Sequence, residues 1–179
     1  MLLFFDVISP IPEICIIEDN KVVLTKKIIS NESEKLSDNI FQVYLQLNKD
    51  LNFSKYLRKI AITNGPGSYT SLRIGAAFVS GLKYSQDLSI YTISANDIIK
   101  FKSQNNQTND IGIFIYSANG QKFLCTMNNN KEPEYSKLED NNIIVPKNIN
   151  FLYFNYKKLN NIVDITQKKF SFMDEFLKN

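Results

Sequence analysis

The sequence predicts an α/β protein in which short strands alternate with long amphipathic helices. Short apolar runs rich in branched and aromatic residues occur repeatedly along the chain and read as strands. Longer stretches between them repeat apolar residues with the helical period. An Asn-Gly step also separates two alternating apolar runs, which is a strong hairpin signal. With 179 residues, of which 44% are hydrophobic, the chain can build one core or two small lobes.

Three strands are expected at the start of the chain, over residues 2–8, 13–18 and 22–29. Proline cannot donate to a ladder, so the connection Pro10-Ile11-Pro12 must be a loop or edge feature. A helix should then begin at Glu34, with Ser30 or Ser33 as its cap.

The first helix has an apolar arc wider than one core contact needs. Its main stripe consists of Leu36, Ile40, Val43, Tyr44 and Leu47. Phe41 and Leu45 form a second stripe beside it.

A buried strand is expected over residues 58–63, followed by a glycine-containing turn and a second helix over about residues 70–84. Apolar residues cover nearly half the circumference of this helix, and small residues lie between them: Gly75, Ala76, Ala77, Ser80 and Gly81. Such small residues let another helix approach closely. A strand over 89–94 and a helical segment over 95–104 should complete this part.

The polar segment NNQTND is the best boundary, so we expect one lobe over residues 1–104 and a smaller one over 105–179. Beyond it, strands over 111–117 and 122–127 flank the predicted hairpin turn. Two more strands are expected over 141–146 and 150–156, and a short helix over 168–179.

Composition excludes several classes of function. The chain has no histidine, so a histidine-based catalytic triad, zinc site or general base is not available. Cys15 and Cys125 lie in apolar runs and should be buried free thiols. The net charge of +3 is spread along the chain and marks no nucleic-acid footprint. Asp6 interrupts the apolar segment at the start of the sequence, and no later apolar segment is long enough to span a membrane. We therefore expect a cytoplasmic protein.

The stretch ITNGPGSYTSLRIG is the strongest candidate for a functional motif. A turn formed by Gly65, Gly67 and Ser68 before a helix could hold an anion on free backbone N–H groups. Neither nucleotide template fits, because the lysine of a P-loop is missing from 69–71 and the Rossmann glycine spacing is absent. The alternative is a tight turn with Ser68 or Thr70 as the helix cap.

The block GPGSYTSLRIGAAFVSGLKYSQ resembles the motif of the TsaB family, also called YeaZ, closely over residues 65–82. LLFFDVIS, ISNESEKLSDNIFQVYLQL and IYSANGQKFLCTM stand where the family has its first strand, first helix and later hairpin. The resemblance implies an actin-like ATPase (ASKHA) fold with two related α/β lobes, the second one reduced here. It further implies a non-catalytic subunit in the synthesis of threonylcarbamoyladenosine (t6A) in tRNA.

The resemblance also implies partners and contact residues. The family pairs with the catalytic subunit TsaD through the two helices described above and works with the ATPase TsaE, so tRNA would be reached indirectly. No cofactor or metal is implied, and a homodimer through the same helices is not exclusive of this reading. The expected partner contacts are Leu36, Ile40, Val43, Tyr44, Leu47, Tyr69, Leu72, Arg73, Ala76, Val79 and Ser80.

The alternative from another class is a small ATP-dependent phosphotransferase of the same fold, using Asp6 and the turn over residues 65–68. Such an enzyme needs a glycine after the aspartate so that backbone amides can approach phosphate, yet Val7 and Ile8 follow here. The chain departs from the TsaB pattern at Tyr69, at Ser71 and at residues 116–118, where Tyr-Ser-Ala replaces Asp-Ala-Arg.

Overall fold

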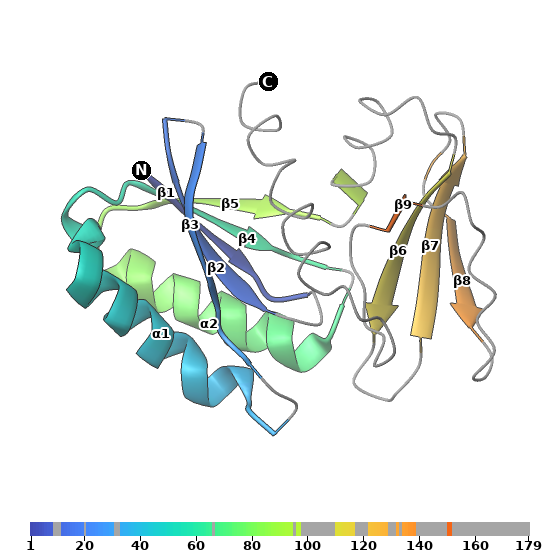
Figure 1. Cartoon of the computed structure of the whole chain (residues 1–179), viewed down its shortest axis with the longest axis horizontal. Helices are drawn as coiled ribbons and strands as arrows, with labels where there is room; N and C mark the ends of the chain where they lie inside the picture. The colour runs from blue at the N-terminus through green and yellow to red at the C-terminus, as the bar shows by residue number, and fades with distance from the viewer. Residues whose placement is uncertain are drawn as a thin grey trace.

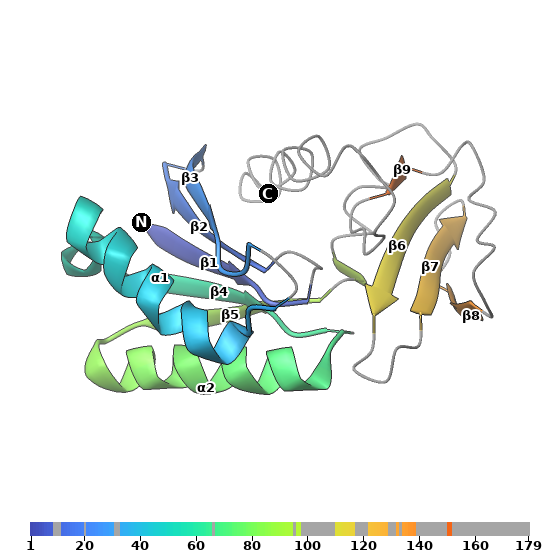
Figure 2. The same ribbon diagram turned by 60° about the horizontal axis from the view of Figure 1, so that its bottom comes forward.

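A five-stranded mixed sheet with two helices on one face forms the amino-terminal part of the chain (Figures 1 and 2). The structure, a computed structural model, describes residues 1–8, 12–19, 21–30, 33–65, 67–94, 96–97, 110–116, 122–128, 132, 134–138 and 150–151. The strands are β1 (Leu2–Asp6), β2 (Glu13–Glu18), β3 (Lys21–Lys27), β4 (Lys59–Thr63) and β5 (Ser89–Ile93). The helices are α1 (Leu36–Leu51), α2 (Tyr69–Ser85) and the short 3₁₀ helix η1 (Phe53–Lys55).

The strand order β3-β2-β1-β4-β5 places β1 at the centre of this sheet. β1 pairs antiparallel with β2, and β2 antiparallel with β3, whereas β1, β4 and β5 run parallel. The carboxyl ends of β1 and β4 therefore lie at the same edge of the sheet. These five strands confirm the ones expected from the sequence, with ends that differ by two residues or fewer.

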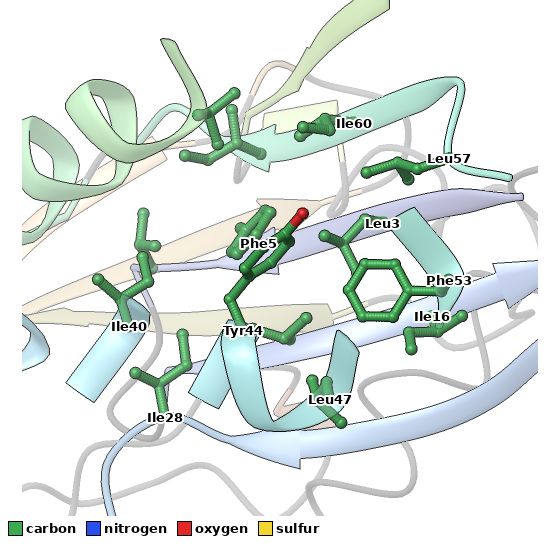
Figure 3. Close-up of a cluster of buried hydrophobic side chains, with 14 of the residues drawn as sticks. Leu3, Phe5, Ile16, Ile28, Ile40, Tyr44, Leu47, Phe53, Leu57 and Ile60 are labelled. Atoms are coloured by element: carbon green, nitrogen blue, oxygen red, sulfur yellow. The ribbon is translucent and has the colours of Figure 1, made fainter. Parts of the chain in front are cut away.

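The core lies between the sheet and the two helices (Figure 3). Alternate side chains of the strands face the helices, among them Leu3, Phe5, Ile14, Ile16, Ile60 and Ile62. They meet the main stripe of α1, which consists of the buried residues Leu36, Ile40, Tyr44 and Leu47. Burial of this stripe supplies the tertiary packing on which a helix of this length depends in water.

Phe78 joins the two helices to the central strand. Its ring makes edge-to-face contacts with Phe5 of β1, at 5.5 Å between ring centroids, and with Tyr44 of α1, at 5.6 Å. Toward the outside it contacts Phe41 of α1 at 6.4 Å. Aromatic pairs of this geometry contribute about 0.5–1.5 kcal/mol each beyond their buried area.

The two helices begin differently. Ser68 caps α2 as expected, its Oγ accepting a hydrogen bond from the Ser71 N–H at 3.4 Å. The predicted Ser30 or Ser33 cap of α1 is wrong, because α1 begins at Leu36 with Lys35 as its N-cap and no side-chain cap bond. Glu34 instead accepts from the Ser30 N–H at 2.7 Å, outside the helix.

A second, four-stranded sheet has the order β8-β7-β6-β9. Its strands are β6 (Asp110–Tyr116), β7 (Lys122–Asn128), β8 (Glu134–Leu138) and β9 (Asn150–Phe151). The antiparallel pairing of β6 with β7 confirms the expected pair of strands on either side of the Asn-Gly step, whereas β8 was not expected. Nearly all of the helix expected over 95–104, the strand over 141–146 and the helix over 168–179 lie outside the described residues. The division into lobes at residue 104 stays a prediction.

The outermost strand β3 has an exposed and basic surface. Lys21, Lys26 and Lys27 are exposed, as are Val23 and Leu24. In the part of the chain that the structure describes, neither long helix has the length and apolar character that a bilayer span would need.

Tyr44 should make the stability of the protein depend on alkaline pH. Burial raises the pKa of its hydroxyl above the ordinary value of 10.0, and a hydrogen bond with the Gln86 side chain offsets part of this rise. Because the folded state favours the neutral phenol, this contribution is complete below about pH 10 and is lost as the pH rises through the raised pKa. Urea unfolding between about pH 8 and 11 should therefore show a steeper fall in the free energy of unfolding for wild type than for Tyr44→Phe. Equal slopes would contradict it.

Candidate functional site

The glycine turn lies against the carboxyl end of β1. Gly65 has a φ of 109°, a backbone conformation that side chains disfavour. A Cβ placed on Gly67 would lie 2.8 Å from both Cβ and Cγ2 of Ile8. Only glycine at residue 67 leaves room for the branched side chain of Ile8. The turn therefore packs directly on the end of β1.

The first two backbone amides after β1, those of Val7 and Ile8, are engaged within the chain. The Val7 N–H donates to Thr63 Oγ1 at 2.9 Å, and the Ile8 N–H donates to Asp6 Oδ1 at 3.2 Å. A nucleotide phosphate bound at this strand end would need these amides and the space over Gly67. Ile8 takes this space and the internal hydrogen bonds take the two amides, so the described residues at this strand end, Val7, Ile8 and Gly67, do not fit a nucleotide phosphate.

Asp6 is a buried carboxylate with a local role. It is fully buried, stands opposite buried Glu13 in the β1–β2 register, and accepts the Ile8 hydrogen bond described above. This confirms the expectation of a locally hydrogen-bonded aspartate. Among the described residues, no group of three or more His, Cys, Asp or Glu side chains could hold a metal ion.

Several of the expected partner contacts are inside the protein. Leu36, Ile40, Tyr44 and Leu47 of α1 and Val79 of α2 are buried in the chain's own core. They are not available to a partner, because the stripe that they form packs on the sheet, and their expected role is corrected accordingly. Val43 and Leu72 are half-buried and pack against the same core.

The remaining expected contacts share one exposed strip of α2. Tyr69, Arg73, Ala76 and Ser80 are exposed and follow one another at helical spacing. The guanidinium carbon of Arg73 lies 4.7 Å from the centroid of the Tyr69 ring. Such a cation–π contact holds the arginine over the ring. Because Arg73 is exposed, a carboxylate could reach its guanidinium group.

A second exposed surface, which we call the helix-pair face, was missing from the expected contacts. It consists of Phe41, Leu45, Ala77, Phe78 and Gly81. Phe41 and Leu45 are 51% and 43% exposed, although both are large and apolar. The signal was present in the sequence as the second stripe of the first helix. The longer stripe turns inward, so the shorter one lies outside.

The comparisons with known proteins agree with this fold. A sequence model of the family described as TsaD, tRNA N6-adenosine threonylcarbamoyltransferase, matches residues 23–147. No curated protein matches the sequence. The structure is similar to that of YeaZ from Pseudomonas aeruginosa, with 16% identity and a TM-score of 0.57, covering 81% of this chain and 70% of that one.

A second solved structure, an uncharacterized protein from Pseudomonas aeruginosa with similarity to peptidase YeaZ, gives the same result. Its identity is 16% and its TM-score 0.57, over 81% of this chain and 69% of that one. The predicted actin-like ATPase fold and the resemblance to the TsaB (YeaZ) family are confirmed by these matches.

Gly67 and Ile8 should be coupled in stability. A methyl group at residue 67 meets Cβ of Ile8, which no rotamer change can move, so Gly67→Ala should cost about 1–3 kcal/mol of unfolding free energy. Ile8→Gly removes the obstructing atom, so the double variant should lose less than the sum of the two single losses. Denaturant unfolding of the four proteins measures this, and strictly additive losses would count against the contact.

Proposed function

The chain belongs to the tRNA N6-adenosine threonylcarbamoyltransferase (TsaD) family, and we propose that it acts there as a TsaB-type, non-catalytic partner subunit. In this role it binds the catalytic subunit TsaD and supports t6A formation in tRNA, with TsaE joining in the larger complex. The modification takes place in the cytoplasm, and the chain contacts tRNA only indirectly, through TsaD.

The observation that carries the proposal is the helix-pair face. Two large apolar side chains, Phe41 and Leu45, are exposed beside the half-buried ring of Phe78. Exposed apolar side chains clustered over two helices are typical of a protein interaction site. Nearby, the strip from Tyr69 to Ser80 adds a polar margin, with Arg73 as its charged group. An apolar centre with a polar margin is the usual anatomy of an interface between proteins.

The non-catalytic role is supported by the residues that the chain lacks or has replaced. The resemblance to TsaB implies a catalytic relative that binds its metal through histidines, and this sequence has none. The strand end where an actin-like enzyme would hold phosphate is filled by Ile8 against Gly67. A scaffold tolerates both changes, since its task is to present a surface.

Charge placed on the helix-pair face should break the complex while leaving the fold intact. Phe41→Glu and Leu45→Glu each force an unpaired carboxylate into a buried apolar contact, which should cost about 3 kcal/mol or a hundredfold in affinity for TsaD. The matched control is Gln42→Glu, which adds the same charge at an exposed position of the same helix. Co-purification with TsaD and circular dichroism measure complex and fold. Folded variants that still co-purify like the control would refute this surface.

The phosphotransferase alternative has a direct test. Titration of the full chain with ATP and Mg²⁺ should give no saturable heat, because the Val7 and Ile8 amides are bonded within the chain and Ile8 takes the space over Gly67. The Ile8→Gly variant is the informative comparison, since it removes the obstruction without changing Asp6. Saturable binding by the wild-type chain would restore the phosphotransferase hypothesis.

A further inference from the structure

Gly81 lies inside α2, and the packing of the described residues does not require a glycine there. A Cβ built on Gly81 meets no atom of this part of the chain within 4 Å. The same atom on Gly75 would lie 2.9 Å from Ile62 Cδ1 and 3.0 Å from Val7 Cγ1, so Gly75 is explained by the close approach of α2 to the sheet. Glycine in a helix interior is less favourable than alanine. Gly81 therefore lowers the stability of α2, and no contact among the described residues compensates for this.

The position of Gly81 ties it to the helix-pair face. It lies one turn beyond Phe78 and Ala77, so the three share one side of α2. The two helices run in the same direction along the sheet (Figures 1 and 2), and Phe41 contacts Phe78. Leu45, one turn beyond Phe41, is therefore at about the level of Gly81. The next turn carries Tyr84, which is 93% exposed.

We propose that Gly81 is the point where a helix of the TsaD catalytic subunit crosses α2 close to its backbone, making it a determinant of affinity. This inference rests on the proposed function. The distance between packed helices depends on the side chains at their contact, and a glycine allows the closest approach. Leu45 and Tyr84, on either side, then contact the flanks of the incoming helix.

The family match supports the TsaD catalytic subunit as the partner whose helix lies over Gly81. The sequence model of the TsaD enzyme matches residues 23–147, a range that contains both α1 and α2. The enzyme therefore has counterparts of both helices. Two chains that share a fold can pair the same surface around an approximate two-fold axis. A pairing of this kind places a helix of one chain over the exposed backbone of the other.

The test is the variant Gly81→Ala, for which opposite changes are expected in the free chain and in the complex. The free chain should become more stable, with Tm raised by about 2–4 °C, because alanine favours the helix and meets no neighbour. The Kd for TsaD should rise about tenfold, because the new methyl group separates the two helices. Thermal unfolding of the full chain and titration with TsaD from the same organism measure the two changes.

A matched control is Lys83→Ala, which also introduces alanine at an exposed position of α2 but on the opposite side of the helix. It should leave the Kd for TsaD unchanged. If wild type binds TsaD and Gly81→Ala binds equally well, the inference about Gly81 is wrong while the proposed function stands. If wild type does not bind TsaD at all, the proposed function itself fails. Weaker self-association with unchanged binding to TsaD, or a lowered Tm, would also overturn the inference.

Discussion

Phe78 lies where α1, α2 and β1 meet, and its ring contacts with Phe5, Tyr44 and Phe41 determine how the two helices lie on the sheet. With α1 held in this way, Ile40, Tyr44 and Leu47 face inward and Phe41 and Leu45 must face outward. The exposure of the helix-pair face is thus a geometric consequence of the core. Its apolar character, in contrast, is not required by the core.

The glycine turn has a structural role where it meets the end of β1. Gly65 retains the left-handed conformation of a tight turn, and Ser68 still caps the following helix. The space over Gly67 holds Ile8, and the amides after β1 are bonded to Thr63 and Asp6. Glycine is still needed at residue 67, but for packing between a strand end and a turn. The motif therefore connects β4 to α2 in this chain and packs against the end of β1.

Sequence reasoning predicted the strands of the first sheet, α2 and its Ser68 cap, because each depends on local chemistry. It did not predict which stripe of α1 faces inward. Both stripes are apolar, and helical periodicity shows that faces exist without saying which one meets the sheet. The start of α1 was misplaced because two serines offered equally good caps, whereas packing of Leu36 places the first turn after Lys35. β8 was missed because Glu134–Leu138 has little apolar alternation and is recognised only by its pairing with β7.

The contact between Ile8 and Gly67 joins residues far apart in the sequence, so it could not be predicted without the three-dimensional structure. From the sequence, the branched residues after Asp6 already argued against a phosphate site. The structure adds that Ile8 lies against Gly67 and that the Val7 and Ile8 amides are bonded to Thr63 and Asp6. Gly67 is explained by a close contact, whereas Gly81 is notable because no described atom lies close to it.

The lysines of β3 have a consequence for how this chain can assemble. An outermost strand with unpaired backbone groups invites other strands to add to the sheet, and charged side chains, lysine above all, discourage such addition. Lys21, Lys26 and Lys27 bring two copies of a basic strand together in an edge-to-edge pairing, and the like charges repel. The charge of β3 thereby opposes growth of the sheet through addition of further strands at this edge.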